Sequence, residues 1–232
     1  MISHIKAILW KQIKDTLKNK EVLVQFVMFP IMTIVMEYSI DIPHMPNYFF
    51  TNLFAIMYIG MSPLTSTAAI ISEEKEKNTL CVLQMYNIKA IEYLMGNAIY
   101  ILSICMIGSL IMGVAGGYTG VNLLKFMLFM LLGHSCGFLL GAAIGIASKN
   151  QMMATSVTVP VMLLLSFLPM LSMFNDTIKK YSKYIFSEQL YLLINHLEKI
   201  TITLETGGIL LCNIVLVVTL FFVVYKKEFF SR

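Results

Sequence analysis

Six long apolar stretches, separated by short polar segments, divide the chain. A helix needs roughly 20 residues to cross the hydrocarbon core of a bilayer, and each stretch is close to that length and nearly free of charge. The pattern predicts an all-α, polytopic membrane protein in which residues 1–232 form a single transmembrane domain with six transmembrane helices. The stretches run from Val22 to Ile40, Tyr48 to Ser72, Ile91 to Gly116, Val121 to Ser148, Met152 to Met173 and Gly207 to Tyr225.

The composition supports a membrane protein over a soluble one. Hydrophobic residue types make up 58% of the chain and charged types 13%, whereas about a quarter of the residues in soluble domains are charged. The net charge of +4 comes largely from lysines that flank the apolar stretches. Membrane topology explains these lysines better than nucleic-acid binding does. We therefore expect the lipid bilayer, and no nucleic acid, among the partners.

Lysine and arginine are distributed unevenly between the two sides of the predicted bundle. Six crossings place both termini on one side of the membrane. That side would hold twelve of these residues, in the N-terminal segment, the link after Ser72, the turn at Lys149 and the C-terminal tail, against five on the other side. Because basic residues are enriched in cytoplasmic segments, both termini are predicted to be cytoplasmic.

Residues 1–20 have apolar positions at helical spacing, with lysines around the rest of the wheel. This pattern favours an interfacial helix on the inner surface of the membrane. Trp10 supports that interpretation, because indole prefers the level of the lipid headgroups. The alternative is an ordinary lysine-rich cytoplasmic leader. The apolar positions are Ile2, Ile5, Leu9, Ile13 and Leu17.

The link between the second and third stretches combines an acidic cluster with a short apolar run. Acids are favoured near a helix N-terminus, and Asn78 or Thr79 can turn the chain and cap a helix. The run is too short to span the membrane, so residues 73–88 are expected to form a cytoplasmic amphipathic helix that docks on a partner. The acids are Glu73, Glu74 and Glu76, and the docking residues are Leu80, Leu83 and Met85.

The fourth stretch carries four glycines at intervals of four residues, namely Gly133, Gly137, Gly141 and Gly145. Glycine lets two helix backbones approach closely in lipid, where packing drives helix association. The pattern predicts a closely packed face. Its partner is a helix of the same subunit or a helix across a subunit interface.

The segment from Phe174 to Thr206, which the predicted topology places outside the cell, is too long and too apolar for a free loop. A compact protein rarely leaves such a length without structure. We expect an extracellular helical segment, either a short re-entrant helix or a helical hairpin, that dips into the outer leaflet.

Three runs of residues are similar to the motifs of one family. Glu74-Lys75-Glu76-Lys77-Asn78-Thr79-Leu80 is similar to the acids and bases followed by Gly-Thr-Leu that open its coupling helix. Leu94-Met95-Gly96-Asn97 is similar to the Leu-x-Gly-Lys that begins its third span. Ser166 to Lys180, with Ser187 to Leu193, resembles its broken fifth span and outer hairpin. On these residues the chain resembles the membrane subunit of type 2 ABC exporters. Its departures from the usual residues are Asn78, Cys81, Asn97 and Phe186.

The resemblance implies a transport subunit that works as a dimer with a second permease subunit, either identical or different. No Gly-x-x-x-x-Gly-Lys-Ser/Thr phosphate loop occurs, so ATP and Mg²⁺ are expected on a separate ABC ATPase. No catalytic, cofactor-binding or metal-binding residue is expected in this chain. The expected function is export of a hydrophobic or amphipathic compound, by resemblance a peptide or antimicrobial compound, across a bacterial cell membrane.

The alternative function is an ATP-independent channel or secondary carrier. A coupled carrier normally buries paired ionisable groups at mid-membrane, and the centres of the six stretches lack Asp, Lys and Arg. Glu37, near the outer end of the first stretch, and His134, in the fourth, are the ionisable candidates within the stretches. By resemblance the second and fifth spans border the translocation path. Its expected lining is Ser62, Pro63, Thr65, Ser66, Ser156, Thr158 and Pro160.

Overall fold

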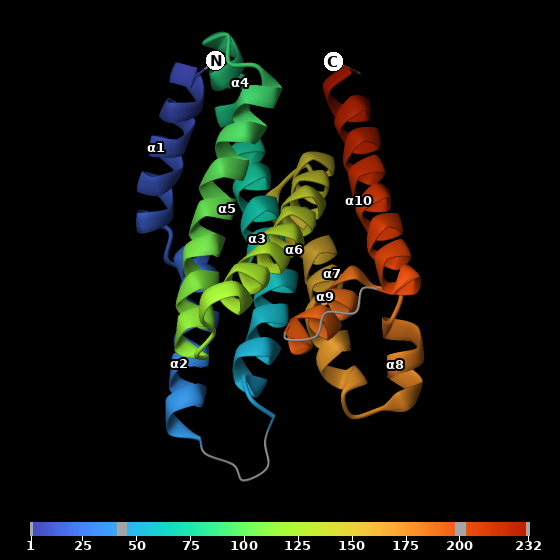
Figure 1. Ribbon diagram of the computed structural model, residues 1–232. Helices are drawn as coiled ribbons and strands as arrows, with labels where there is room; N and C mark the ends of the chain where they lie inside the picture. Colours follow the sequence, from blue (N-terminus) through green and yellow to red (C-terminus); the bar gives the residue numbers. More distant parts are fainter. Residues whose placement is uncertain (1, 41–45, 198–202, 231–232) are drawn as a thin grey trace.

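The computed structural model describes residues 2–40, 46–197 and 203–230, and its elements in these ranges are ten α-helices (Figure 1). Six of them are long and apolar enough to cross a membrane, namely α2, α3, α5, α6, α7 and α10. The predicted all-α fold with six transmembrane helices is therefore confirmed. The helices are α1 (Ile2–Lys18), α2 (Lys20–Ser39), α3 (Phe49–Glu76), α4 (Thr79–Met85), α5 (Ala90–Ala115), α6 (Gly120–Ala147), α7 (Gln151–Ser172), α8 (Asp176–Ser182), α9 (Phe186–Asn195) and α10 (Leu204–Phe230).

Polar residues fix where several of these helices begin. Asn19 caps α2 by accepting a hydrogen bond from the N–H of Val22 at 3.4 Å, and Asn150 caps α7 by accepting one from Met153 at 2.9 Å. Side-chain oxygens of this kind satisfy backbone donors that a helix start leaves free. The turn between α5 and α6 uses Gly117 at φ 82° and Gly120 at φ 54°, a conformation that glycine adopts without steric cost.

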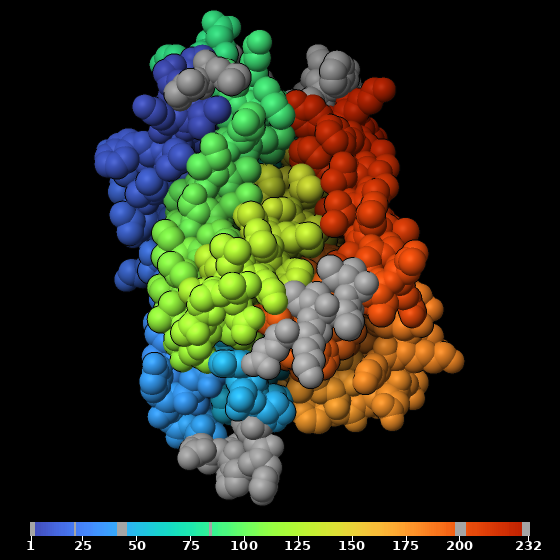
Figure 2. Space-filling view, in the orientation of Figure 1, coloured from blue at the N-terminus to red at the C-terminus, as the bar shows by residue number. Residues whose placement is uncertain are grey.

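Helix α3 is the centre of the bundle. It packs against α2, α5, α6, α7 and α9. In its most apolar stretch of 18 residues 78% is buried inside the protein, compared with 17% in the corresponding stretch of α10. On the face shown in Figure 2, α10 stands at the edge of the molecule beside α6, with much of its length uncovered. The exposed apolar surface of α10 suits contact with lipid, whereas α3 is held on most sides by protein.

The glycine face of α6 lies against α3 of the same chain. A Cβ atom at Gly133 would come within 2.7 Å of the Ile59 side chain, and one at Gly137 within 2.7 Å of the Pro63 ring. The next two glycines meet α3 backbone carbonyls as well as side chains. From the sequence, this glycine face could pack on a helix of the same subunit or on one across a subunit interface. In this structure it packs on α3 of the same chain.

The segment after α7 folds into two short helices. The side chain of Asn175 accepts hydrogen bonds from the first turn of α8, and α9 packs against α3, α6, α7 and α10. Its Glu188 is 1% exposed, and both carboxylate oxygens accept from the hydroxyl of Ser172 at 2.9 Å. Residues 198–202 of the predicted outer segment lie outside the described residues.

Helix α1 starts at one end of the bundle, which also carries α4 and the end of α10 (Figure 1). We call this end of the bundle the α4 end. The most buried side chains of α1 are Ile8, Gln12 and Thr16, and Ile8 packs against Gly96 of α5. Leu17 is 69% exposed. The predicted apolar stripe is therefore rotated, because its last member faces away from the bundle.

Candidate functional site

Helix α4 is held between two left-handed turns. Asn78 has a φ of 56° and Asn87 a φ of 57°, and asparagine tolerates this conformation better than most residues because its short side chain can hydrogen-bond locally. The carbonyl of Asn78 accepts hydrogen bonds from the N–H groups of Cys81 at 3.1 Å and Val82 at 3.4 Å. A new helix therefore starts directly after the turn, and α4 is joined tightly to the end of α3.

The two faces of α4 have different surroundings. Leu80 and Leu83 are half-buried and pack against the hydrophobic core of the chain. Val82 is 49% exposed, Met85 81% and Tyr86 72%. The apolar surface that α4 offers to a partner therefore consists of Val82, Met85 and Tyr86, which we call the α4 face. Of the three docking residues expected from the sequence, Met85 lies on this face and the two leucines do not.

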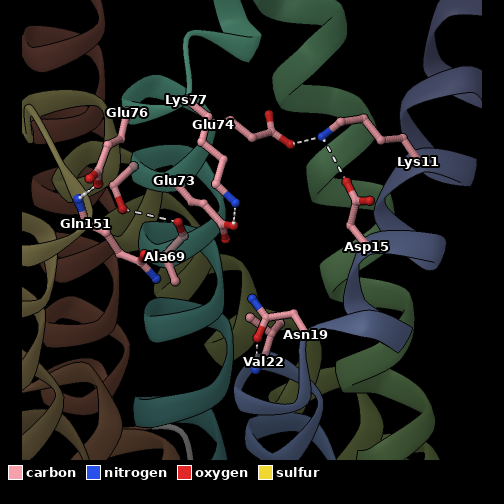
Figure 3. A network of polar contacts seen from close by, with 11 residues as sticks. Lys11, Asp15, Asn19, Val22, Ala69, Glu73, Glu74, Glu76, Lys77 and Gln151 are labelled. Carbon is pink, nitrogen blue, oxygen red and sulfur yellow. Dashed lines mark hydrogen bonds and ion pairs between the residues drawn. The ribbon is translucent and has the colours of Figure 1, made fainter.

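The three glutamates lie in the last turns of α3. The sequence predicted them at the start of the following helix instead. Each has a partner within the chain (Figure 3). Glu73 accepts from Lys77 at 2.5 Å, Glu74 accepts from Lys11 and from Gln12 at 2.7 Å, and Glu76 accepts from the N–H of Gln151 at 2.8 Å. The helix reaches this far because its stop is the left-handed Asn78, which follows the acids. Instead of capping α4, Glu74 and Glu76 connect α3 to α1 and α7, while Glu73 pairs with Lys77 at the end of α3.

The strongest of these connections joins Lys11 of α1 to Glu74 (Figure 3). Asp15 lies 3.2 Å from the same ammonium group. Burial lowers the pKa of Lys11, but the negative charges of Glu74 and Asp15 outweigh it, and the net pKa lies above the ordinary value. Lys11 is therefore protonated at neutral pH. Glu74 is 7% exposed, so its carboxylate faces α1 and is not offered to another protein.

Replacing Glu74 with alanine should loosen α1 from the bundle. The change leaves the ammonium group of Lys11 without its main partner. The Lys11 side chain is 30% exposed, and we expect a loss of about 1–3 kcal/mol after allowance for solvent screening. Limited trypsin digestion in detergent should then cleave α1 several times faster. Lys77→Ala, which breaks the exposed pair with Glu73, is the control and should leave stability nearly unchanged, because exposed ion pairs contribute little. Equal digestion of both variants would contradict the assignment.

A third cation ties the end of α3 to the opposite side of the bundle. Lys75 donates to the carbonyl of Ile146, in α6, at 2.5 Å, and its ammonium group lies 3.5 Å from the carboxylate of Glu228 in α10. Together with the contacts of the glutamates, this links the last turns of α3 to α1, α6, α7 and α10. A displacement of α4 would therefore be transmitted to most of the bundle.

A small cavity of about 260 Å³ lies between α2, α3 and α7, and its wall has both polar and apolar side chains. We call it the polar cavity after its hydroxyl and amide groups. Thr65 donates to the side-chain oxygen of Gln25 at 2.8 Å. Thr158 is 4% exposed, and its hydroxyl has no hydrogen-bond partner among the described residues. Gln151 and Thr155 complete the polar part of the wall. An unpartnered buried hydroxyl on a cavity wall is free to bind a polar group of a ligand.

Only two of the seven residues expected on the translocation path, Thr65 and Thr158, line this cavity. Ser62 and Ser66 are fully buried and donate to backbone carbonyls. Pro63 packs against α6. Ser156 and Pro160 are exposed on the outer face of α7. Gln25, Gln151 and Thr155 also line the cavity and were not predicted from the sequence. The signal that could have found them is an amide near the end of a span that faces a neighbouring hydroxyl.

The two ionisable candidates of the sequence both have structural partners. One carboxylate oxygen of Glu37 accepts from the N–H of Thr51 at 2.8 Å and from its hydroxyl at 2.6 Å, near the start of α3. His134 is fully buried, and its Nε2 lies 2.8 Å from the hydroxyl of Ser109. Among the described residues no group of three or more His, Cys, Asp or Glu side chains could hold a metal ion.

The six candidate spans fit one known family. The family model of the ABC-2 type transporter matches residues 3–187. The chain belongs to this family. It is therefore the membrane domain of a multi-pass transporter, and its role is transport without catalysis of its own. Permeases of this family work with ABC ATPase partners in the lipid bilayer. No curated protein is similar enough to the chain to count as a match.

Proposed function

We propose that this ABC-2 permease is the membrane subunit of an ATP-driven exporter whose separate ATPase docks on the α4 face. The observation that carries the proposal is the exposure of Val82 and Met85 on a short helix joined to the end of α3, and of Tyr86 directly after it. Large apolar side chains on a surface outside the membrane spans favour a protein partner. ATP and Mg²⁺ are bound by that partner, and the α4 end with both termini lies in the cytoplasm of a bacterial cell.

The contacts of the last turns of α3 explain how such docking would drive transport. Binding of ATP would move the α4 face with the ATPase, and α3 would carry the movement into the bundle, where it borders the polar cavity. The three glutamates act inside the chain in this scheme. Glu74 and Glu76 hold α3 to α1 and α7, and Glu73 pairs with Lys77 at the end of α3 itself. Leu80 and Leu83 keep α4 seated on the bundle.

The polar cavity is the proposed contact site for the substrate, on a face of the bundle where a second permease subunit would complete the path. Its wall combines hydroxyl and amide groups with Val22, Val159 and Met162. This mixture suits an amphipathic substrate, such as a hydrophobic peptide with polar groups. Among the described residues no cation or carboxylate lines the cavity, which favours an ATP-driven exporter over an ion-coupled carrier.

Thr158→Leu should lower transport, because the larger side chain fills the cavity and removes its unpartnered hydroxyl. Ser156→Leu lies two residues earlier on the exposed face of the same helix and is the matched control. Membrane vesicles with the permease and its ATPase should take up a labelled amphipathic peptide at least about fivefold more slowly for the first variant, with the control within a factor of about 2. A change of one methyl-sized group at a binding contact has effects of this order.

The same vesicles test the class of transporter. Uptake that needs ATP supports the exporter. Uptake without ATP, or with a proton gradient alone, would instead support the channel or secondary carrier. An unaffected Thr158→Leu variant with a slowed Ser156→Leu variant would move the path to the exposed face of α7.

A further inference from the structure

A second cavity, of about 620 Å³, lies where α1, α2, α3 and α4 meet at the α4 end. Its wall includes the last turns of α1, from Lys11 to Lys18, and the first turn of α2. Val22, on the same wall, is the first buried apolar residue of the first span. The cavity therefore lies at the level where the first span enters the membrane, which is the level of the lipid headgroups.

The charges around this cavity leave two cations without a partner. Four lysines and three acids line it. Lys11 is paired with Glu74 and Asp15, and Lys77 with Glu73 (Figure 3). The remaining two, Lys18 and Lys20, are exposed and have no ion-pair partner among the described residues. The positive end of the α2 helix dipole, which begins at Lys20, adds to their field. The site therefore favours an anion.

The surface beside the cavity is apolar and follows the first span. Leu17 of α1 is 69% exposed, and Leu23, Val24 and Val27 of α2 are 36%, 53% and 41% exposed. A soluble anion gains nothing from this surface. An amphipathic anion could place its charged group in the cavity and its hydrocarbon chains along α2.

We propose that this cavity binds the phosphodiester headgroup of an anionic phospholipid, with Lys18 and Lys20 as its cations and the exposed face of α2 as the bed for its acyl chains. The bound lipid fills the space between α1 and the end of α3, and it fastens α1 to the membrane beside α4. The Lys11, Glu74 and Asp15 group forms the far wall and holds the cavity open. This inference is independent of the transport function proposed above.

Native mass spectrometry of the full chain with phosphatidylglycerol and phosphatidylcholine tests the proposal. Wild-type protein should retain one phosphatidylglycerol per chain in preference to phosphatidylcholine. The double variant Lys18→Gln and Lys20→Gln should bind it roughly 25-fold more weakly, since each basic residue near an anionic lipid contributes about a fivefold effect. Lys18→Arg with Lys20→Arg keeps the charges and should retain binding, which controls for folding.

Lys226→Gln with Lys227→Gln is the matched charge control, because both lysines are exposed at the α4 end and neither lines the cavity. Equal losses in the two glutamine variants would reduce the effect to net charge and overturn the site. Glycerol phosphate that competes as well as the intact lipid would show a site for free phosphate esters and overturn the lipid assignment. If the Lys18→Gln and Lys20→Gln variant binds lipid as the wild type does but loses the partner ATPase, the lipid site is overturned in favour of a protein contact.

Discussion

Serine at both Val82 and Met85 should prevent the permease from copurifying with its ATPase, without unfolding the six spans. Both side chains are exposed on the α4 face, so their loss removes little from the packing of the chain, and surface changes of this kind usually alter stability by under about 0.5 kcal/mol. Apolar anchors at the centre of an interface each contribute over about 1 kcal/mol. Together the two changes should weaken binding by roughly 30-fold or more.

Serine at Leu80 and Leu83 is the matched control, with the same number of changes on the opposite face of the same helix. These leucines pack against the core, and each polar replacement of a half-buried leucine should cost about 1–2 kcal/mol of the stability of the chain. This variant should unfold at a lower temperature and lose the ATPase as a secondary effect. Full retention of the ATPase by the Val82 and Met85 variant, with normal ATP-dependent uptake, would refute docking through the α4 face.

Charge at the end of α3 should contribute less to this docking than the apolar face. Glu73, Glu74 and Glu76 are close to the α4 face, but all three accept hydrogen bonds within the chain. Exposed charges are also screened beyond roughly 8 Å at physiological ionic strength. Copurification should therefore change little with salt concentration.

The spans could be predicted from the sequence because apolar length is a local property. Five of the six predicted stretches start within three residues of their helices and end within four, whereas α10 runs to Phe230, five residues beyond the predicted end at Tyr225. Lysines follow that end, and a helix that has left the hydrocarbon can continue through them. The outer segment was also predictable as helical, since its aromatic and aliphatic residues exceed what a free loop carries.

The orientation of α4 could not be predicted in the same way. Leu80, Val82, Leu83 and Met85 are all apolar, and a helix of seven residues is too short for its pattern to select one face. The face is set by two left-handed turns and by the packing behind them. The prediction placed the three glutamates on the wrong side of the turn for a related reason. An acidic cluster before an apolar run is typical of a helix start, and the position of the left-handed residue decides on which side of the turn the cluster lies.

Alanine at Gly141 is the second change with a large expected effect. An added Cβ would overlap the carbonyl oxygen of Leu64 and come within 2.9 Å of the Thr67 Cβ. The carbonyl is part of the α3 backbone and cannot turn aside, so α6 must move away from the central helix. Overpacking of this kind costs about 1–3 kcal/mol. The variant should lower the unfolding temperature of the chain in detergent.

Alanine at Gly208 makes the same chemical change with the opposite expectation. A Cβ at Gly208 of α10 meets no atom of the described residues within 4 Å, and alanine favours a helix by up to about 1 kcal/mol over glycine. This variant should therefore match or exceed the stability of the wild-type chain. The pair also decides between the two partners that the sequence allowed for the glycine face. If the face formed a subunit interface, Gly141→Ala would separate the subunits while each chain unfolded at its normal temperature. Packing against α3 requires the chain itself to lose stability.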